Sequence, residues 1–231
     1  IEEAAHAPGA TMNGKHAGSF GRAAVLSLYA TKPINAGEGG IILTDDAELA
    51  EKAKVYRNYG RAKSFGMSVL IYPGDSWRLT EIQAAIGIEQ VRRQAIIDEE
   101  RQMLANRYHD LIKPLKDRGI FPYEPAEGTK PNWYRYLMKL PRGWNHEMRQ
   151  ELKAYAREHY GVDIPGEVYE VPVCDMPIWK DKFHASFPNA EDWCARNIAL
   201  PIWNTMTLEE QQIVVKAVAE GFDKVSAVYK G

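Results

Sequence analysis

Lys32 is the residue of this chain whose surroundings best suit covalent chemistry. It lies in the stretch Ser27–Ile41, SLYATKPINAGEGGI, where small and hydroxyl residues precede the lysine and a glycine-rich turn follows it. A lysine just after a buried strand is partly desolvated, so its amine loses its proton more easily and can attack a carbonyl to form a Schiff base. Taken alone, the pattern also fits a solvated surface lysine beside glycines that only close a hairpin.

Two short apolar segments flank this lysine and must position it. Residues 23–28 and 40–44 are apolar runs bounded by Gly, Lys or Asp, which predicts buried strands. Residues 1–7 are typical of the end of a strand running into a turn. The two aspartates before residue 47 would cap an amphipathic helix over residues 47–58. Strand, loop, strand and helix in this order predict an α/β layer.

The next segment links this layer to the rest of the chain. Residues 61–77 carry glycines and a proline among mixed polar residues, which predicts a loop of a length that tends to be functional. From Thr80, a plausible helix cap, apolar residues recur every three or four positions for about thirty residues. This spacing predicts one long helix, or two joined by a kink, leading out of a first domain at residues 1–112.

A second, smaller α+β domain is predicted at residues 113–231. Its expected elements, in chain order, are an alternating strand at 133–140, a helix at 146–159, a proline-rich loop through Val173 and a last amphipathic helix at 207–228.

Composition narrows the class of protein. The chain has 231 residues, of which 45% are hydrophobic and 26% charged, the mix of an ordinary globular protein. A net charge of −2 with no strongly basic stretch argues against nucleic acid as a partner. Two cysteines without metal-ligand spacing argue against a disulfide framework and a metal site. No apolar run suits a membrane helix, and we expect a cytoplasmic protein.

Four segments together resemble the DegT/StrS family of sugar aminotransferases, which are pyridoxal 5'-phosphate enzymes of fold type I. The hydroxyl of Ser27, the amine of Lys32 and the Gly-Glu-Gly-Gly turn stand in the family's order and spacing. The resembling segments are residues 1–10, 18–44, 56–87 and 199–215. The resemblance implies an α/β fold: the C-terminal part of the large cofactor domain, with part of its mainly parallel sheet and a long linking helix, followed by the small domain.

The resemblance also implies roles for particular residues. Lys32 matches the lysine that forms the Schiff base with the cofactor and then shuttles a proton. Ser27 matches the hydroxyl that holds the cofactor phosphate. Glu3 stands where relatives have an aspartate against the pyridine nitrogen, and His6 stands near the ring's phenolic oxygen. Glutamate for aspartate is a departure, because one more methylene moves the carboxylate forward by roughly 1.5 Å.

Two further positions depart from the family pattern. Ser76 stands where relatives have an asparagine that reaches the cofactor phosphate of the neighbouring subunit, which implies a homodimer with a shared site. Arg78 and Glu81 could equally form a surface or intrahelical pair or touch the substrate. Cys174 takes the place of a histidine near the substrate, and a buried, inert thiol is its expected role.

The resemblance implies an aminotransferase that moves an amino group from glutamate or glutamine to a keto group of a nucleotide-linked sugar or an aminocyclitol precursor, in cell-surface polysaccharide or antibiotic biosynthesis. The first part of the family's large domain has no counterpart in this sequence, so we expect that the chain needs it for stability. Two alternatives stay open. One is a non-catalytic or regulatory partner of a full-length relative. The other is a sugar dehydratase, although the family's dehydratases replace the lysine at Lys32 by histidine.

Overall fold

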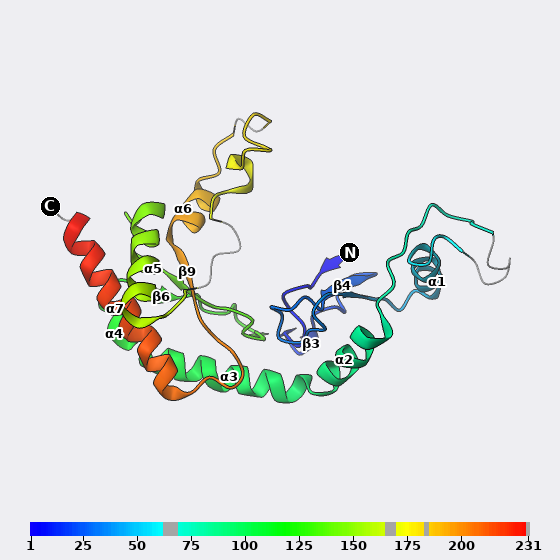
Figure 1. The fold of residues 1–231 in the computed structure, drawn as a ribbon, viewed down its shortest axis with the longest axis horizontal. Coiled ribbons are helices and arrows are strands. Elements are labelled where there is room, and N and C mark those ends of the chain that lie inside the picture. The colour runs from blue at the N-terminus through cyan, green and yellow to red at the C-terminus, as the bar shows by residue number, and fades with distance from the viewer. Residues whose placement is uncertain (62–68, 165–169, 183–184, 230–231) are drawn as a thin grey trace. The chain divides into compact units, whose positions relative to one another are not determined.

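The computed structural model describes residues 1–61, 69–164, 170–182 and 185–229 (Figure 1). The chain divides into two compact units, an N unit of residues 1–99 and 125–134 and a C unit of residues 100–124 and 135–231. Each unit mixes helices and strands, as predicted. The predicted domain border after residue 112 stays a prediction, but the units show that a segment beyond it, residues 125–134, packs with the N unit.

The first sheet of the N unit has the strand order β1-β4-β5. Its strands are β1 (Glu2–Glu3), β4 (Ala24–Ser27) and β5 (Gly40–Leu43). β1 runs parallel to β4, and β5 runs antiparallel to it, so the sheet is mixed and its expected mainly parallel character stays a prediction. The prediction that β5 is buried is wrong, because in this edge strand only Ile41 packs against the core and the other three residues are exposed.

Helices α1 (Ala47–Tyr56) and α2 (Glu81–Arg92) begin close to where the sequence predicts, and α3 (Gln94–Leu111) follows α2. Asp46 caps α1 by accepting the N–H of Leu49 at 2.9 Å. Thr80 and Gln83 form a capping box that satisfies two donors at the start of α2. Of the two predicted arrangements, one long helix or two joined by a kink, the structure has two helices, because the backbone of Arg93 departs from the helical conformation. The first half of the predicted loop, residues 62–68, lies outside the described residues.

A small second sheet of the N unit was not predicted. Its order is β3-β2-β7, with β2 (Thr11–Met12), β3 (Lys15–His16) and β7 (Thr129–Lys130). Asn13 and Gly14 both have positive φ, 50° and 77°, at the turn between β2 and β3. An Asn-Gly pair is a strong hairpin signal, so the sequence carried the information for this turn. The pairing of β2 with β7 joins residues far apart in the chain.

The C unit holds a sheet of order β6-β8-β9 together with helices. Its elements are α4 (Lys113–Lys116), β6 (Phe121–Pro122), β8 (Tyr136–Lys139), α5 (His146–Tyr160), a 3-10 turn (Val173–Asp175), α6 (Pro188–Arg196), β9 (Asn197–Leu200) and α7 (Leu208–Tyr229). Sequence reasoning missed α6 and β9. It also made β8 too long, because Trp133 has a φ of 50° and no strand contains that conformation.

Helices α5 and α7 lie side by side in the C unit (Figure 1). A Cβ at Gly221 would lie 3.1 Å from the ring of Tyr155 and 3.4 Å from the carbonyl oxygen of Leu152, so the glycine permits this close approach. The rings of Trp144 and Phe222 stack at 4.8 Å. Among the described helices, none is both long and apolar enough to cross a bilayer.

Candidate active site

The parallel pairing of β1 and β4 brings the predicted site residues other than Ser76 to the carboxyl ends of these two strands. Glu3 lies opposite Val25, and the N–H of Ala4 donates to the carbonyl of Val25 at 3.0 Å. Because the carboxyl ends of parallel strands meet at the same edge, Glu3 and Ser27 end their strands together. His6 follows in the turn after β1, and Lys32 follows in the loop after β4. Ligands of open α/β sheets bind at such an edge.

Apolar anchors hold the loop that carries Lys32. Leu28, Ile34 and Ala36 are buried in a cluster with Ile97 of α3, and the loop is closed by hydrogen bonds from Leu28 to Gly39 and from Ala36 to Leu28, each 2.9 Å. The loop is therefore an ordered excursion between β4 and β5 and not a tight hairpin. Lys32 is half-buried and lies between the buried anchors Leu28 and Ile34.

Tyr134 covers the Lys32 side chain. The Lys32 Nζ atom lies 4.8 Å from the centre of the Tyr134 ring, and the His6 ring meets the same ring edge-on at 4.8 Å. The Tyr134 hydroxyl and Thr31 Oγ1 are hydrogen-bonded at 2.9 Å. The sequence analysis placed Tyr134 in a strand and did not predict its contact with Lys32. Nothing near residue 134 indicates a contact with a loop a hundred residues earlier. The structure thus groups Lys32, His6 and Tyr134.

Ser27 ends β4 with its hydroxyl near the start of the loop. Its Oγ accepts the N–H of Tyr29 at 3.2 Å, and the side chain is half-buried. A hydroxyl that accepts one hydrogen bond still has its own hydrogen to donate. Ser27 can therefore donate to an anionic group at the sheet edge.

Glu2 and Glu3 have different surroundings. The carboxylate of Glu2 accepts the N–H groups of Gly18 at 2.7 Å and Phe20 at 2.9 Å, and these two hydrogen bonds, that of Gly18 first, lower the pKa of Glu2. Glu3 is exposed and accepts the N–H of Ala5 at 2.8 Å. Successive strand residues point to opposite faces of the sheet. The Glu2 side chain is therefore used in hydrogen bonds that stabilise the turn at residues 18–20, and the Glu3 side chain stays accessible.

Ser76 and Arg78 form a separate group around Tyr59. Ser76 pairs with Asn58 through the backbone, and hydrogen bonds from Ser76 and then Arg78 lower the pKa of the Tyr59 phenol. The guanidinium of Arg78 lies 4.9 Å from the centre of the Tyr59 ring and donates to Asn58 at 2.8 Å. Arg78 thus contacts Asn58 and Tyr59, and its contact with the substrate stays a prediction.

The expectation that Cys174 is buried is wrong. It lies half-buried in the 3-10 turn, where exposed neighbours leave it partly open, whereas Cys194 of α6 is buried. Partial burial and then the charge of Asp175 raise the pKa of the Cys174 thiol. In the part of the chain that the structure describes, no three His, Cys, Asp or Glu residues group as metal ligands would.

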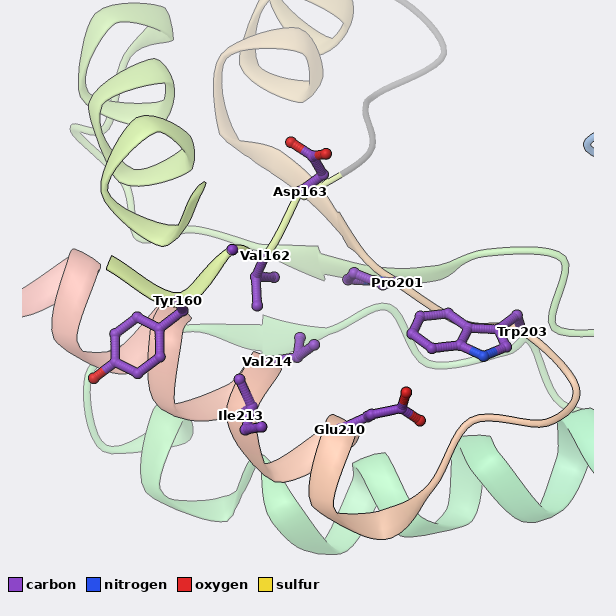
Figure 2. Close-up of a pocket in the computed structure, with 9 residues that line it drawn as sticks. Tyr160, Val162, Asp163, Pro201, Trp203, Glu210, Ile213 and Val214 are labelled. Atoms are coloured by element: carbon purple, nitrogen blue, oxygen red, sulfur yellow. The ribbon is translucent and has the colours of Figure 1, made fainter. Parts of the chain in front are cut away.

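A pocket of about 370 Å³ opens in the C unit, and none of the predicted site residues lines it (Figure 2). Trp203, Val162 and Val214 line it together with Glu210, whose carboxylate accepts the backbone N–H of Thr207 at 2.7 Å as part of the cap of α7. The carboxylate of Glu210 is therefore already engaged in capping α7.

Comparison with known proteins gives a consistent result. The model of the DegT/DnrJ/EryC1/StrS aminotransferase family matches residues 1–219. The spore coat polysaccharide biosynthesis protein SpsC of Bacillus subtilis is 29% identical over 95% of this chain and 59% of its own length. The UDP-4-amino-4,6-dideoxy-N-acetyl-beta-L-altrosamine transaminase of Helicobacter pylori is 28% identical over 96% of this chain and 58% of its own length.

A solved structure agrees with these relatives. Helicobacter pylori PseC, an aminotransferase involved in the biosynthesis of pseudoaminic acid, superposes with a TM-score of 0.85 at 26% identity, over 96% of this chain and 59% of that chain. This chain therefore spans less than two thirds of the length of the relatives that it matches.

Proposed function

The chain belongs to the DegT/DnrJ/EryC1/StrS aminotransferase family, and on this premise we propose that it carries part of a pyridoxal-phosphate site for amino transfer to a sugar. The amino group would come from glutamate or glutamine and go to a keto group of a nucleotide-linked sugar or an aminocyclitol precursor. The observation that carries the proposal is the convergence of Lys32, Ser27, Glu3 and His6 at one sheet edge.

The donor set at this edge fits pyridoxal phosphate. Lys32 offers a primary amine, Ser27 a hydroxyl donor for a phosphate, and Glu3 an accessible carboxylate for a ring nitrogen. When bound, the cofactor supplies an electron sink for a carbanion next to nitrogen.

The residues of this chain have distinct tasks in the proposed reaction. The Lys32 amine would take a proton from the substrate carbon as a general base and would then deliver it, as a general acid, to a carbon of the cofactor. The Glu3 carboxylate would keep a proton on the ring nitrogen of the cofactor, because a neighbouring negative charge favours the protonated form. The His6 ring packs edge-on against the ring of Tyr134, the same ring that Lys32 contacts.

The proposal includes a homodimer in which Ser76 reaches the site of the neighbouring chain. Its support is a bare apolar surface beside that serine: Trp77 is 66% exposed and Ile82 of α2 is 76% exposed. Large exposed apolar side chains in one region are typical of an interface.

Trapping of the cofactor on Lys32 tests the proposal. The full chain is incubated with pyridoxal phosphate, reduced with borohydride, digested and mapped by mass spectrometry. We expect a phosphopyridoxyl group on the peptide that contains Lys32, and its loss in Lys32→Ala. Lys15→Ala is the matched control, because Lys15 also lies over an aromatic ring, 4.7 Å from the centre of Phe20.

Labelling spread over many lysines, or unchanged after Lys32→Ala, would contradict the proposal. With the adduct established, keto sugars linked to nucleotides are offered with glutamate or glutamine, and the amino sugar is measured.

A further inference from the structure

We propose that Tyr134 is a positioning residue for the Lys32 amine: its ring holds the side-chain nitrogen in place over the sheet edge. The inference rests on the proposed function of Lys32 and adds a residue from a distant part of the chain to that site. Two sets of contacts support it. One set fixes the backbone at Tyr134, and the other joins the Tyr134 side chain to Thr31, His6 and Lys32.

The backbone before Tyr134 is attached to the turn that carries His6. The amide nitrogen of the Asn132 side chain donates to the carbonyl oxygens of His6 and Pro8, both at 3.0 Å, and its Oδ1 accepts the N–H of Tyr134 at 3.1 Å. Asn132 is 7% exposed, so these hydrogen bonds are shielded from water. One side chain thus ties the Tyr134 backbone to the site.

Trp133 shows that this placement is enforced. Its φ of 50° is in the left-handed region, which is unfavourable for a bulky residue and persists only where the surroundings hold it. The Trp133 side chain is 8% exposed, so its burial offsets the strain. After this turn, Tyr134 contacts the loop that carries Lys32.

The Tyr134 side chain is then held on three sides. Thr31 bonds its hydroxyl at 2.9 Å, His6 packs edge-on at an interplanar angle of 62°, and the Lys32 Nζ lies 4.8 Å from the ring centre. A cation within about 6 Å of a ring centre is attracted by the π-electrons. A ring with fixed orientation therefore selects among the many rotamers of a lysine.

This arrangement matters for chemistry at the amine. A lysine that must reach one carbonyl carbon gains from being held near its reacting position, because misplacement of about 1 Å can cost roughly a hundred-fold in rate. The ring contact at 4.8 Å supplies such a restraint on the side-chain nitrogen. Asn132, Trp133 and Tyr134 together act as a support for Lys32.

The experiment compares Tyr134→Leu, which removes the ring, with Tyr134→Phe, which keeps the ring and loses only the hydroxyl. The free chain is acetylated with acetic anhydride at a fixed pH, and the rates at Lys32 and Lys15 are read by mass spectrometry. In Tyr134→Leu we expect Lys32 to be acetylated about two- to five-fold faster, because its amine is no longer held against the ring. Tyr134→Phe should leave the rate at Lys32 unchanged.

Phe20→Leu is the matched control, because it removes the ring from Lys15 instead. It should change the acetylation rate of Lys15 and leave that of Lys32 unchanged. An unchanged rate at Lys32 in Tyr134→Leu, or an equal change in Tyr134→Phe, would overturn the inference.

A second measurement needs no variant. In the native chain with reductively ¹³C-methylated lysines, the ring should displace the methyl signal of Lys32 upfield of the signals of exposed lysines, and a signal at their position would overturn the inference. In the trapping assay, Tyr134→Leu should lower the yield at Lys32 several-fold and Tyr134→Phe should not. Failure of the native chain to be trapped contradicts the proposed function, whereas both acetylation and methyl shift test Tyr134 without cofactor.

Discussion

Adjacent carboxylates on β1 have separate tasks because a strand turns successive side chains to opposite faces. Glu2 accepts two backbone N–H groups from the turn at residues 18–20, and Glu3 stays exposed at the sheet edge. Glu3, which we propose as the partner of the cofactor ring, is thus accessible, whereas the hydrogen bonds of Glu2 hold β1 to the turn. At the residue scale, the proposed site depends on Glu3, and not Glu2, having the exposed carboxylate.

Glu2→Gln should weaken the N unit near neutral pH and lose its effect in acid. Hydrogen bonds from Gly18 and Phe20 hold the pKa of Glu2 below its ordinary 4.5. A lowered pKa in the folded state contributes stability above the unfolded value, and this contribution is lost as the pH falls through the folded pKa. Unfolding by urea at a series of pH values measures this. The free energy of unfolding of the variant should be lower than that of the native chain at pH 7, and the two values should converge below pH 4.5.

Glu3→Gln is the control for this prediction, because Glu3 accepts one N–H in an exposed position. It should destabilise the fold less at pH 7. Equal stability of Glu2→Gln and the native chain at pH 7 would show that the negative charge of Glu2 and its second acceptor oxygen contribute nothing.

At the scale of elements, the end of α1 depends on a glycine. Gly60 has a φ of 74° and its N–H donates to the carbonyl of Val55 at 2.9 Å. A Cβ there would lie 1.7 Å from the carbonyl oxygen of Tyr72. The backbone of the segment that leads to Ser76 therefore approaches α1 at a point where only glycine fits.

Gly60→Ala should be markedly destabilising. The left-handed conformation alone costs about 1–2 kcal/mol with a Cβ, and displacing the Tyr72 backbone adds about 1–3 kcal/mol. Gly14→Ala is the matched control, with a φ of 77° and nothing within 4 Å of the added carbon. It should cost only the conformational part. Chemical denaturation of both variants measures the difference, and equal losses would contradict the close approach.

At the scale of the whole molecule, two compact units share one chain, and the path of the chain between them is not sequential. The segment at residues 125–134 belongs to the N unit although both its flanks belong to the C unit. This return places Asn132 and Tyr134 beside residues from the start of the chain. The C unit has its own buried core, in which α5 packs on α7.

Leu152→Ala should test that core. Leu152 is fully buried on α5, and truncation of a buried leucine costs about 2–5 kcal/mol. Hydrogen exchange of the amides in α5 and α7 should become faster. Leu208→Ala at the exposed start of α7 is the control and should change stability by less than about 0.5 kcal/mol. Equal protection in the two variants would show that the contact between α5 and α7 does not stabilise the unit.

The sequence by itself was enough for features whose causes lie within a few residues of one another. Helix starts at Asp46 and Thr80 followed from side chains that cap the next turn, and the lysine loop followed from its apolar run and glycines. The family resemblance, carried by motifs of this kind, is confirmed by the match over residues 1–219. The roles of Lys32, Ser27, Glu3, His6 and Ser76 stay predictions.

Only the tertiary structure decided features that depend on distant neighbours. An apolar run cannot show whether its strand is covered, and β5 is exposed because it lies at the edge. The short length of β8 depends on the buried, left-handed Trp133, and the contact of Tyr134 with Lys32 depends on hydrogen bonds from Asn132 to the turn after β1. Capping and periodicity act over one turn of chain, whereas burial and cross-chain contacts arise only after the chain has folded back on itself.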